Sequence, residues 1–171
     1  MTRSLRLRGL LLGGVCAGTL VAAGPAFAEM PRSVGYSVPP VAVSPAGEVV
    51  SAADDIDPDV FVRFAPPGGV LGAPERVSRN GVQPSIVAGP RGDSLAIWST
   101  SNPPWRVMAA FRPPGGAFGR PVVITHTTGR DAPEYDGALD AAGTATIVWS
   151  TSAAGVRVRT RSAAGRWAPG R

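Results

Sequence analysis

One segment of this 171-residue chain occurs twice with its internal spacing intact. The sequence FAPPGGVLGAP at 64–74 returns as FRPPGGAFGRP at 111–121, 47 residues later (111 − 64). A weaker third copy, TRSAAGRW, occupies 160–167. A fixed period of about 40–50 residues is typical of repeat architectures. We therefore expect the chain to consist of similar structural units.

The stretches between these turn segments have the character of short β-strands. In the central unit each strand-like run ends at Gly or Pro, and these runs lie at 84–88, 94–100, 105–112 and 121–125. From residue 29 onward, no stretch of about twelve residues shows a helical period without a Gly or Pro break. The pattern predicts an all-β fold made of short antiparallel strands.

Alignment of the turn segments divides the chain into three expected units. Trp98 and Trp149 fall at the same place, 51 residues apart (149 − 98), and each precedes Ser-Thr-Ser. The recurrence predicts that both tryptophans pack between units. Leu71, Phe118 and Trp167 are also in register, and we expect them to be buried. The expected four-stranded antiparallel units, the last one incomplete, are 41–78, 84–125 and 135–171.

Units of this length with four antiparallel strands resemble β-propeller blades. They resemble in particular the units of secreted propeller-like repeat proteins of actinobacteria, and more distantly those of sialidase-type and WD-repeat propellers. The resemblance implies a propeller-like stack of sheets. The Trp-Asp dipeptide of WD repeats is absent, and the stretch 140–149 only echoes the aspartate box of sialidase-type blades. That departure argues against sialidase activity.

The number of units is unusual for a propeller, because closed propellers have at least about four blades. Three explanations stay open. The chain is a truncated product, it is an open array that is completed by oligomerisation, or the segment 33–38 supplies the missing strand of the last unit. We favour the first two, because the last explanation mends one unit but does not change the number of units.

The N-terminus has the three parts of a secretory signal peptide. Three arginines in the first eight residues precede an apolar run at 9–24, and the Ala-Phe-Ala at 26–28 supplies a cleavage site. The apolar run is shorter than the roughly 20 residues that span a bilayer. We expect 1–28 to be removed, 29–40 to form an N-terminal extension, and the protein to be secreted and not membrane-spanning. Cys16 leaves with the signal peptide, so no disulfide is expected.

The net positive charge is small once the signal peptide is set aside. The remaining 14 arginines (17 − 3) are interspersed with 12 acidic residues, and the chain has no lysine. Nucleic-acid binding needs a basic stripe or patch, so it is not expected. Arg157, Arg159 and Arg161 alternate along one predicted strand and would share a face. We interpret that face as solvated.

Few residues are candidates for chemistry. His126 is the only histidine, and the chain has neither a Gly-x-Ser-x-Gly motif nor a cysteine after residue 16, so we predict no catalytic residue. Asp55, Asp57 and Asp59 are spaced like the first ligands of a calcium loop. The later Gly and Glu of such a loop are missing, so they indicate only weak calcium binding, and no other cofactor is expected. Trp105 has no aromatic counterpart in the other units and is the candidate for carbohydrate contact.

These observations favour a secreted, non-catalytic binding or structural protein built of propeller-like repeats. Its expected partners are carbohydrate or protein at the cell surface, together with self-association through the incomplete unit. The alternative is an extracellular sialidase-like glycoside hydrolase or a carbohydrate-binding module. Arginine and carboxylate side chains that converge on the channel side of the sheets would favour the hydrolase.

Overall fold

The computed structural model describes residues 39–55, 57–127, 132–151 and 155–170. Within these ranges the chain forms strands and turns but no helix, so the prediction of an all-β fold is confirmed. The predicted signal peptide and the segment 33–38 lie outside the described residues. The eleven strands are β1 (Val41–Val43), β2 (Val49–Asp54), β3 (Val60–Ala65), β4 (Glu75–Ser78), β5 (Val82–Ala88), β6 (Ser94–Ser99), β7 (Arg106–Arg112), β8 (Val122–His126), β9 (Glu134–Leu139), β10 (Ala145–Thr151) and β11 (Gly155–Arg161).

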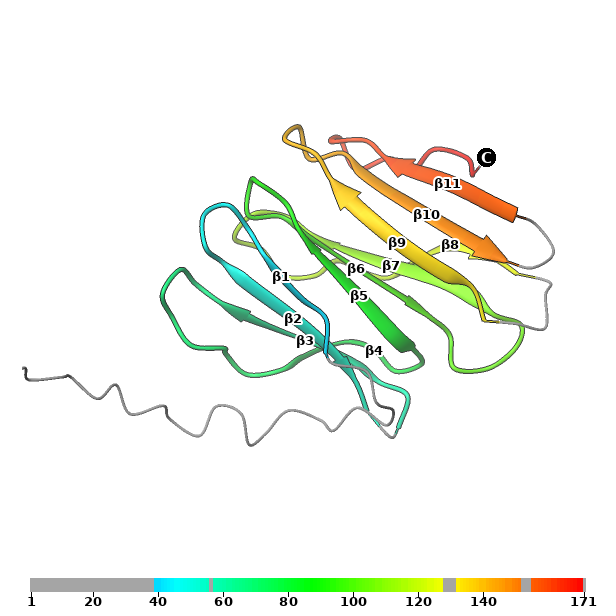
Figure 1. The fold of residues 1–171 in the computed structure, drawn as a ribbon, viewed down its shortest axis with the longest axis horizontal. Coiled ribbons are helices and arrows are strands. Elements are labelled where there is room, and N and C mark those ends of the chain that lie inside the picture. The colour runs from blue at the N-terminus through cyan, green and yellow to red at the C-terminus, as the bar shows by residue number, and fades with distance from the viewer. Residues whose placement is uncertain (1–38, 56, 128–131, 152–154, 171) are drawn as a thin grey trace, which may run out of the picture.

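The strands form three antiparallel sheets, and within each sheet a strand pairs with its neighbours in the sequence (Figure 1). The first sheet has the order β1-β2-β3-β4 and the second has the order β5-β6-β7-β8. The third sheet contains three strands in the described part of the chain, in the order β11-β10-β9. One further bridge pairs Trp167 with Arg161 beyond the end of β11.

The hairpin at the start of each sheet depends on a glycine in the same place. Gly47, Gly92 and Gly143 have φ angles of +85°, +79° and +84°, a region that costs glycine nothing and most other residues energy. Each of these glycines donates its amide to the carbonyl three residues earlier, at 2.8, 3.2 and 3.0 Å. The turns after β1, β5 and β9 therefore share one geometry.

The turn segments after β3, β7 and β11 also share a hydrogen bond. The amides of Gly72, Gly119 and Ala168 each donate to the carbonyl of the residue eight positions earlier (72 − 64), at 2.8, 3.0 and 2.8 Å. The bond folds the chain back past the end of the preceding strand. These segments therefore act as connections at one end of each sheet.

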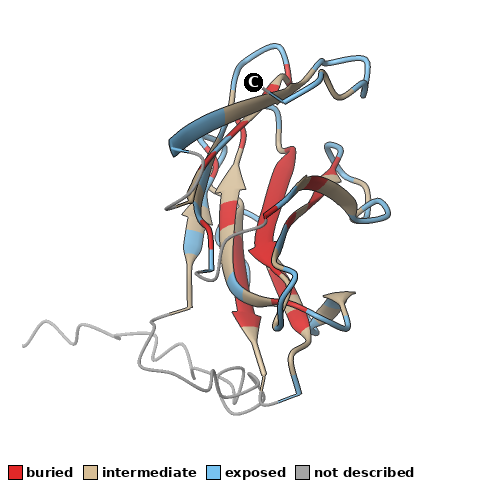
Figure 2. Cartoon of the chain, turned by 90° about the vertical axis from the view of Figure 1, so that its right-hand side faces the viewer, coloured by how far each residue is buried: buried red, intermediate tan, exposed pale blue. Residues whose placement is uncertain are grey.

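The three sheets are stacked, and an apolar cluster fills each of the two gaps between them. β5 lies against β1 and β2, and β9 lies against β5 and β6. The first cluster contains Trp98 and the second contains Trp149, and both tryptophans are buried, as their recurrence predicts. Buried residues concentrate on the central strands (Figure 2), and every residue of β6 is buried, because the second sheet is covered on each face.

Leu71, Phe118 and Trp167 are less buried than their shared register predicts, although two of them pack against an apolar cluster. Phe118 packs against the first apolar cluster and Trp167 against the second. All three residues are only partly buried. They lie in the connections at the end of the sheets, where the neighbouring sheet covers one side of a side chain and leaves the other open.

Candidate functional site

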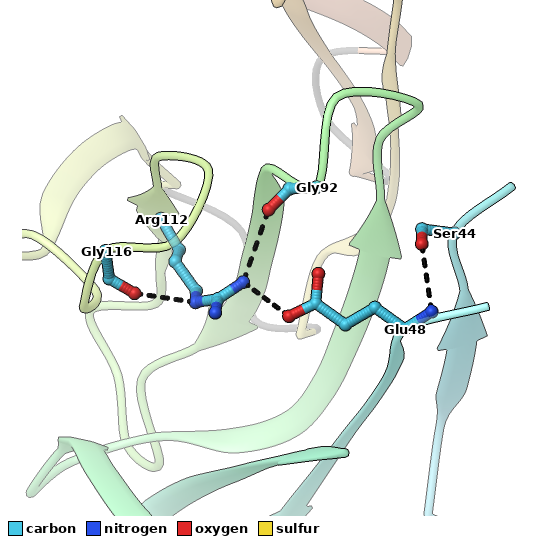
Figure 3. Close-up of polar contacts among 5 residues, drawn as sticks. All are labelled: Ser44, Glu48, Gly92, Arg112 and Gly116. Carbon is cyan, nitrogen blue, oxygen red and sulfur yellow. Dashed lines mark hydrogen bonds and ion pairs between the residues drawn. The ribbon is translucent and has the colours of Figure 1, made fainter. Parts of the chain in front are cut away.

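A polar contact between the first two sheets is built around Arg112, the last residue of β7 (Figure 3). Its guanidinium lies over the ring of Phe64, 3.9 Å from the ring centroid. Its Nη1 donates to Oε1 of Glu48 at 2.8 Å, and its Nε donates to the carbonyl of Gly116 at 2.8 Å. Phe64 and Glu48 belong to the first sheet and its first turn, so Arg112 joins the two sheets. We call Arg112, Phe64 and Glu48 the first arginine clamp.

A second arginine clamp, formed by Arg161, Phe111 and Asp93, joins the third sheet to the second. The Arg161 guanidinium lies 3.8 Å from the centroid of the Phe111 ring. Asp93 is buried, and no described residue donates a hydrogen bond to its carboxylate. Burial lowers the pKa of Arg161, and the negative charge of Asp93 acts in the opposite direction. The cation–π contact therefore recurs one sheet further along the stack, while the carboxylate acts on the second arginine through its charge alone.

The prediction of a solvated arginine face on β11 is wrong for two of its three residues. Arg161 stacks on Phe111, as described above. Arg159 donates from Nη1 to the carbonyl oxygens of Val123 and Ile124 on β8, at 2.9 and 3.0 Å. Only Arg157 of the three is exposed. The arginines lie on the side of the third sheet that faces the second sheet, which the sequence of one strand does not specify.

The third sheet lacks the phenylalanine and the carboxylate that would contact the arginine of a further sheet. Thr160 stands where both clamps have phenylalanine, and Thr144 stands where both have a carboxylate. On the first sheet, Ala65 stands at the place of the clamp arginine. The third sheet instead has a hollow of about 400 Å³, lined by Thr144, Thr160, Ser162, Arg166, Trp167 and Ala168.

The third sheet presents one face to solvent at the end of the stack (Figure 1). Ala145, Ile147 and Trp149 on β10 belong to the second apolar cluster, and successive residues of a strand point to opposite faces. The strand register then defines the outer face of the third sheet as Glu134, Asp136, Ala138, Thr146, Val148, Ser150, Val156, Val158 and Thr160.

This outer face differs in character from the equivalent face of the second sheet. There, Leu95 and Ile97 are fully buried against the third sheet. On the outer face of the third sheet, Val148 and Val156 are 39% and 80% exposed. These two valines line a hollow of about 310 Å³ whose other lining residues are Glu134, Tyr135, Asp136, Trp149 and Ser150. The face thus combines exposed valines with hydroxyl groups and two carboxylates.

A polar chain joins all three sheets near the starts of β5 and β9. Asp54 accepts a hydrogen bond from the amide of Gln83 at 3.0 Å, and the Tyr135 hydroxyl lies within hydrogen-bond distance of the carbonyl oxygens of Val82 and Gln83. Gln83 has a φ of +55°, and the register between β5 and β6 is irregular here. Burial raises the pKa of Tyr135 to about 12, so its hydroxyl keeps the proton that it donates. This series of hydrogen bonds is a structural connection between the sheets.

Trp105, the candidate for carbohydrate contact, directly precedes β7 and is half-buried. Its carbonyl oxygen accepts hydrogen bonds from the amide of Thr127 at 2.9 Å and from the Thr127 hydroxyl at 3.2 Å. The residue is therefore less exposed than the sequence suggests. Carbohydrate contact at Trp105 stays a prediction.

The three aspartates proposed for calcium lie in the loop between β2 and β3. Asp59 pairs with Arg76, with Nη1 and Oδ2 3.0 Å apart, while Asp57 is exposed. The amide of Asp55 donates to the carbonyl of Asp59 at 3.1 Å, which holds the ends of the loop together. In the described part of the chain, no three His, Cys, Asp or Glu side chains are grouped to hold a metal ion. Weak calcium binding here stays a prediction from the spacing alone.

His126 is exposed at the end of β8, where it pairs across the sheet with Arg106. His126 therefore lies on the rim of the second sheet. Within the part of the chain that the structure describes, no helix is long and apolar enough to cross a membrane.

Sequence reasoning missed both arginine clamps, although the repeated segment contains a signal for them. Phenylalanine begins the segment in the first two units, and arginine follows at the next position in the last two units. The two residue types are thus offset by one unit. Such an offset is expected when each unit supplies the arginine that contacts the phenylalanine of the unit before it.

No protein-family model matches the chain, and no curated protein matches its sequence.

Proposed function

We propose that this protein is a secreted, non-catalytic module in which three propeller-like sheets support one interaction surface, the outer face of the third sheet. The observation that carries the proposal is the exposure of Val148 and Val156 on that face. The equivalent face of the second sheet is covered by the next sheet in the stack. Exposed apolar residues bordered by polar ones are typical of interaction sites.

The two arginine clamps support the proposal that the stack is a rigid support. Each clamp contains a cation–π contact between two sheets. The first clamp adds an ion pair that is largely shielded from water, where such interactions are stronger than at an exposed site. A surface carried by a fixed sheet loses less conformational entropy on binding than a surface carried by loops.

The placement of the charged residues favours binding over hydrolysis. A glycosidase needs two carboxyl groups on either side of a substrate bond. Glu48 and Asp93 instead lie between sheets, beside the clamp arginines, and Asp59 is paired with Arg76. These carboxylates hold the fold, and the outer face offers Glu134 and Asp136 beside exposed valines.

The proposal is tested by following the protein outside the producing cells. We expect the protein in the extracellular fraction, where it sediments together with cell-envelope material. The double change Val148→Lys and Val156→Lys places two charges on the apolar part of the outer face, and we expect it to release at least about tenfold more protein into the soluble medium.

Val70→Lys is the matched control, because Val70 is equally exposed, at 76%, but lies in a connection away from the third sheet. We expect this variant to behave like the unchanged protein. Equal release of both variants, or protein retained inside the cell, would contradict the proposal. Turnover of a sialylated oligosaccharide by the purified protein would contradict its non-catalytic part and favour the hydrolase.

A further inference from the structure

We propose that the outer face of the third sheet binds the same face of a second copy of this chain, about a two-fold axis perpendicular to the strands. The inference rests on the proposed function, because it names a partner that the same surface takes in the purified protein, where no envelope is present. Two observations carry it: the charge distribution along the face, and its exposed valines.

Among the described residues, the opposite end of the stack exposes apolar side chains only on its edge strand. Val41 and Val43 of β1 pair with Ser51 and Val49 on the outer face of the first sheet, and they are 60% and 61% exposed. Val50, Ala52 and Val62 belong to the first apolar cluster, so their side chains face the second sheet. The residues that alternate with them along β2 and β3 lie on the opposite face of the first sheet, and they include Ser51, Ala53, Arg63 and Ala65. All four residues are buried, with exposed fractions of 2–4%. Stacking of the first sheet of one copy on the third sheet of another would continue without closing, whereas pairing of like faces closes at two copies.

The charges on the third sheet select the direction of the axis. Glu134 and Asp136 lie at one end of the outer face, opposite Ser150 and Val148 of β10. Arg166 lies at the other end, where it lines the hollow beside Thr144 and Thr160. A two-fold axis that lies in the interface and runs parallel to the strands would place Glu134 and Asp136 of one copy over the same residues of the other. An axis perpendicular to the strands places the acidic end of each copy over Arg166 of its partner, and complementary charges of this kind fix register.

The middle of the face supplies the apolar contact. Val148 pairs across the sheet with Val158, and Val156 lies next along β11 on the same face. Two sheets pack face to face at about 10 Å, with the side chains of both faces interdigitated. Val156 is 80% exposed, so it has the most surface to bury in such packing.

The size of the face predicts a weak dimer. Three strands at about 4.8 Å spacing, each about seven residues long at roughly 3.4 Å per residue, give a footprint of about 14 by 24 Å. The footprint is well below the roughly 800 Å² that each partner contributes to a standard interface. We expect pairing to depend on concentration and to appear between about 10 µM and 1 mM.

Sedimentation velocity of the purified protein over this concentration range tests the proposal. We expect a shift from monomer to dimer and no larger species. Val148→Lys with Val156→Lys should remain monomeric at the highest concentration, whereas Val70→Lys should pair like the unchanged protein. Both sets of changes are at exposed positions, so circular dichroism should show the same fold in every variant.

A charge exchange tests the axis. Asp136→Arg alone, or Arg166→Glu alone, places like charges together and should weaken pairing at least about tenfold at low salt. The two changes in one chain restore opposite charges across the two-fold axis, and should return the dissociation constant to within about threefold of the original. A purely structural effect of either change would not be reversed by the other.

The outcomes separate this inference from the proposed function. A protein that stays monomeric at 1 mM, that forms open-ended polymers, or whose pairing survives the two lysines overturns the inference. If the purified protein is monomeric but release from the envelope still depends on Val148 and Val156, the pairing is wrong and the proposed function stands. If neither pairing nor release responds to the two lysines, both are wrong.

Discussion

Arg112→Ala is expected to lower the free energy of unfolding by about 3 kcal/mol. The change removes the stack on Phe64 and the ion pair with Glu48 together, and it leaves the Glu48 carboxylate without its cation at a largely buried contact. It also frees the carbonyl of Gly116, which accepts a hydrogen bond from Arg112 Nε. Urea denaturation followed by tryptophan fluorescence measures the loss.

Arg76→Ala is the matched control for this prediction. Arg76 also pairs with a carboxylate, that of Asp59, at 3.0 Å, but the arginine side chain is 43% exposed, against 11% for Arg112. Exposed ion pairs typically contribute at most about 1 kcal/mol. If both alanine variants lose the same stability, the first arginine clamp is no stronger than a surface salt bridge.

Trp98→Ala is expected to cost about 4 kcal/mol, a larger loss than that of Arg112→Ala. Trp98 is fully buried in the first apolar cluster, between the first and second sheets. Its indole also fills the space above Gly81, where a Cβ would collide with the ring. Removal of the indole leaves a cavity between two sheets, and we expect Tm to fall by about 10 °C in a thermal scan.

Trp105→Ala provides the comparison, because it removes the same side chain from a half-buried site before β7. We expect a loss of about 1–2 kcal/mol. A Trp98→Ala protein that unfolds within about 1 kcal/mol of the original would show that the first two sheets are not held together through this cluster.

The local structure of this chain could be read from its residues. Alternation of apolar runs with Gly and Pro predicts the strands, and Gly47, Gly92 and Gly143 each stand where a turn requires positive φ. The recurrence of Trp98 and Trp149 predicts their burial between sheets. These features depend on neighbours within a few residues or on exact repetition, and both are visible in one sequence.

The contacts between sheets could not be read in the same way. The sequence of β11 shows that Arg157, Arg159 and Arg161 share a face, but only the position of the second sheet shows that this face is inside the stack. The aromatic partner of Arg161 is 50 residues away (161 − 111). Trp105 likewise seemed the most accessible aromatic residue because it does not recur, and its half-buried place depends on the packing around β7.

We infer that one kind of arginine contact orders the three sheets into a stack that ends at Thr144 and Thr160. Two double-mutant cycles test it most directly, one with Arg112→Met and Phe64→Leu, the other with Arg161→Met and Phe111→Leu. We expect coupling energies of the same sign and of about 1–2 kcal/mol in both cycles. Additive effects in either cycle, with a coupling below about 0.5 kcal/mol, would contradict it.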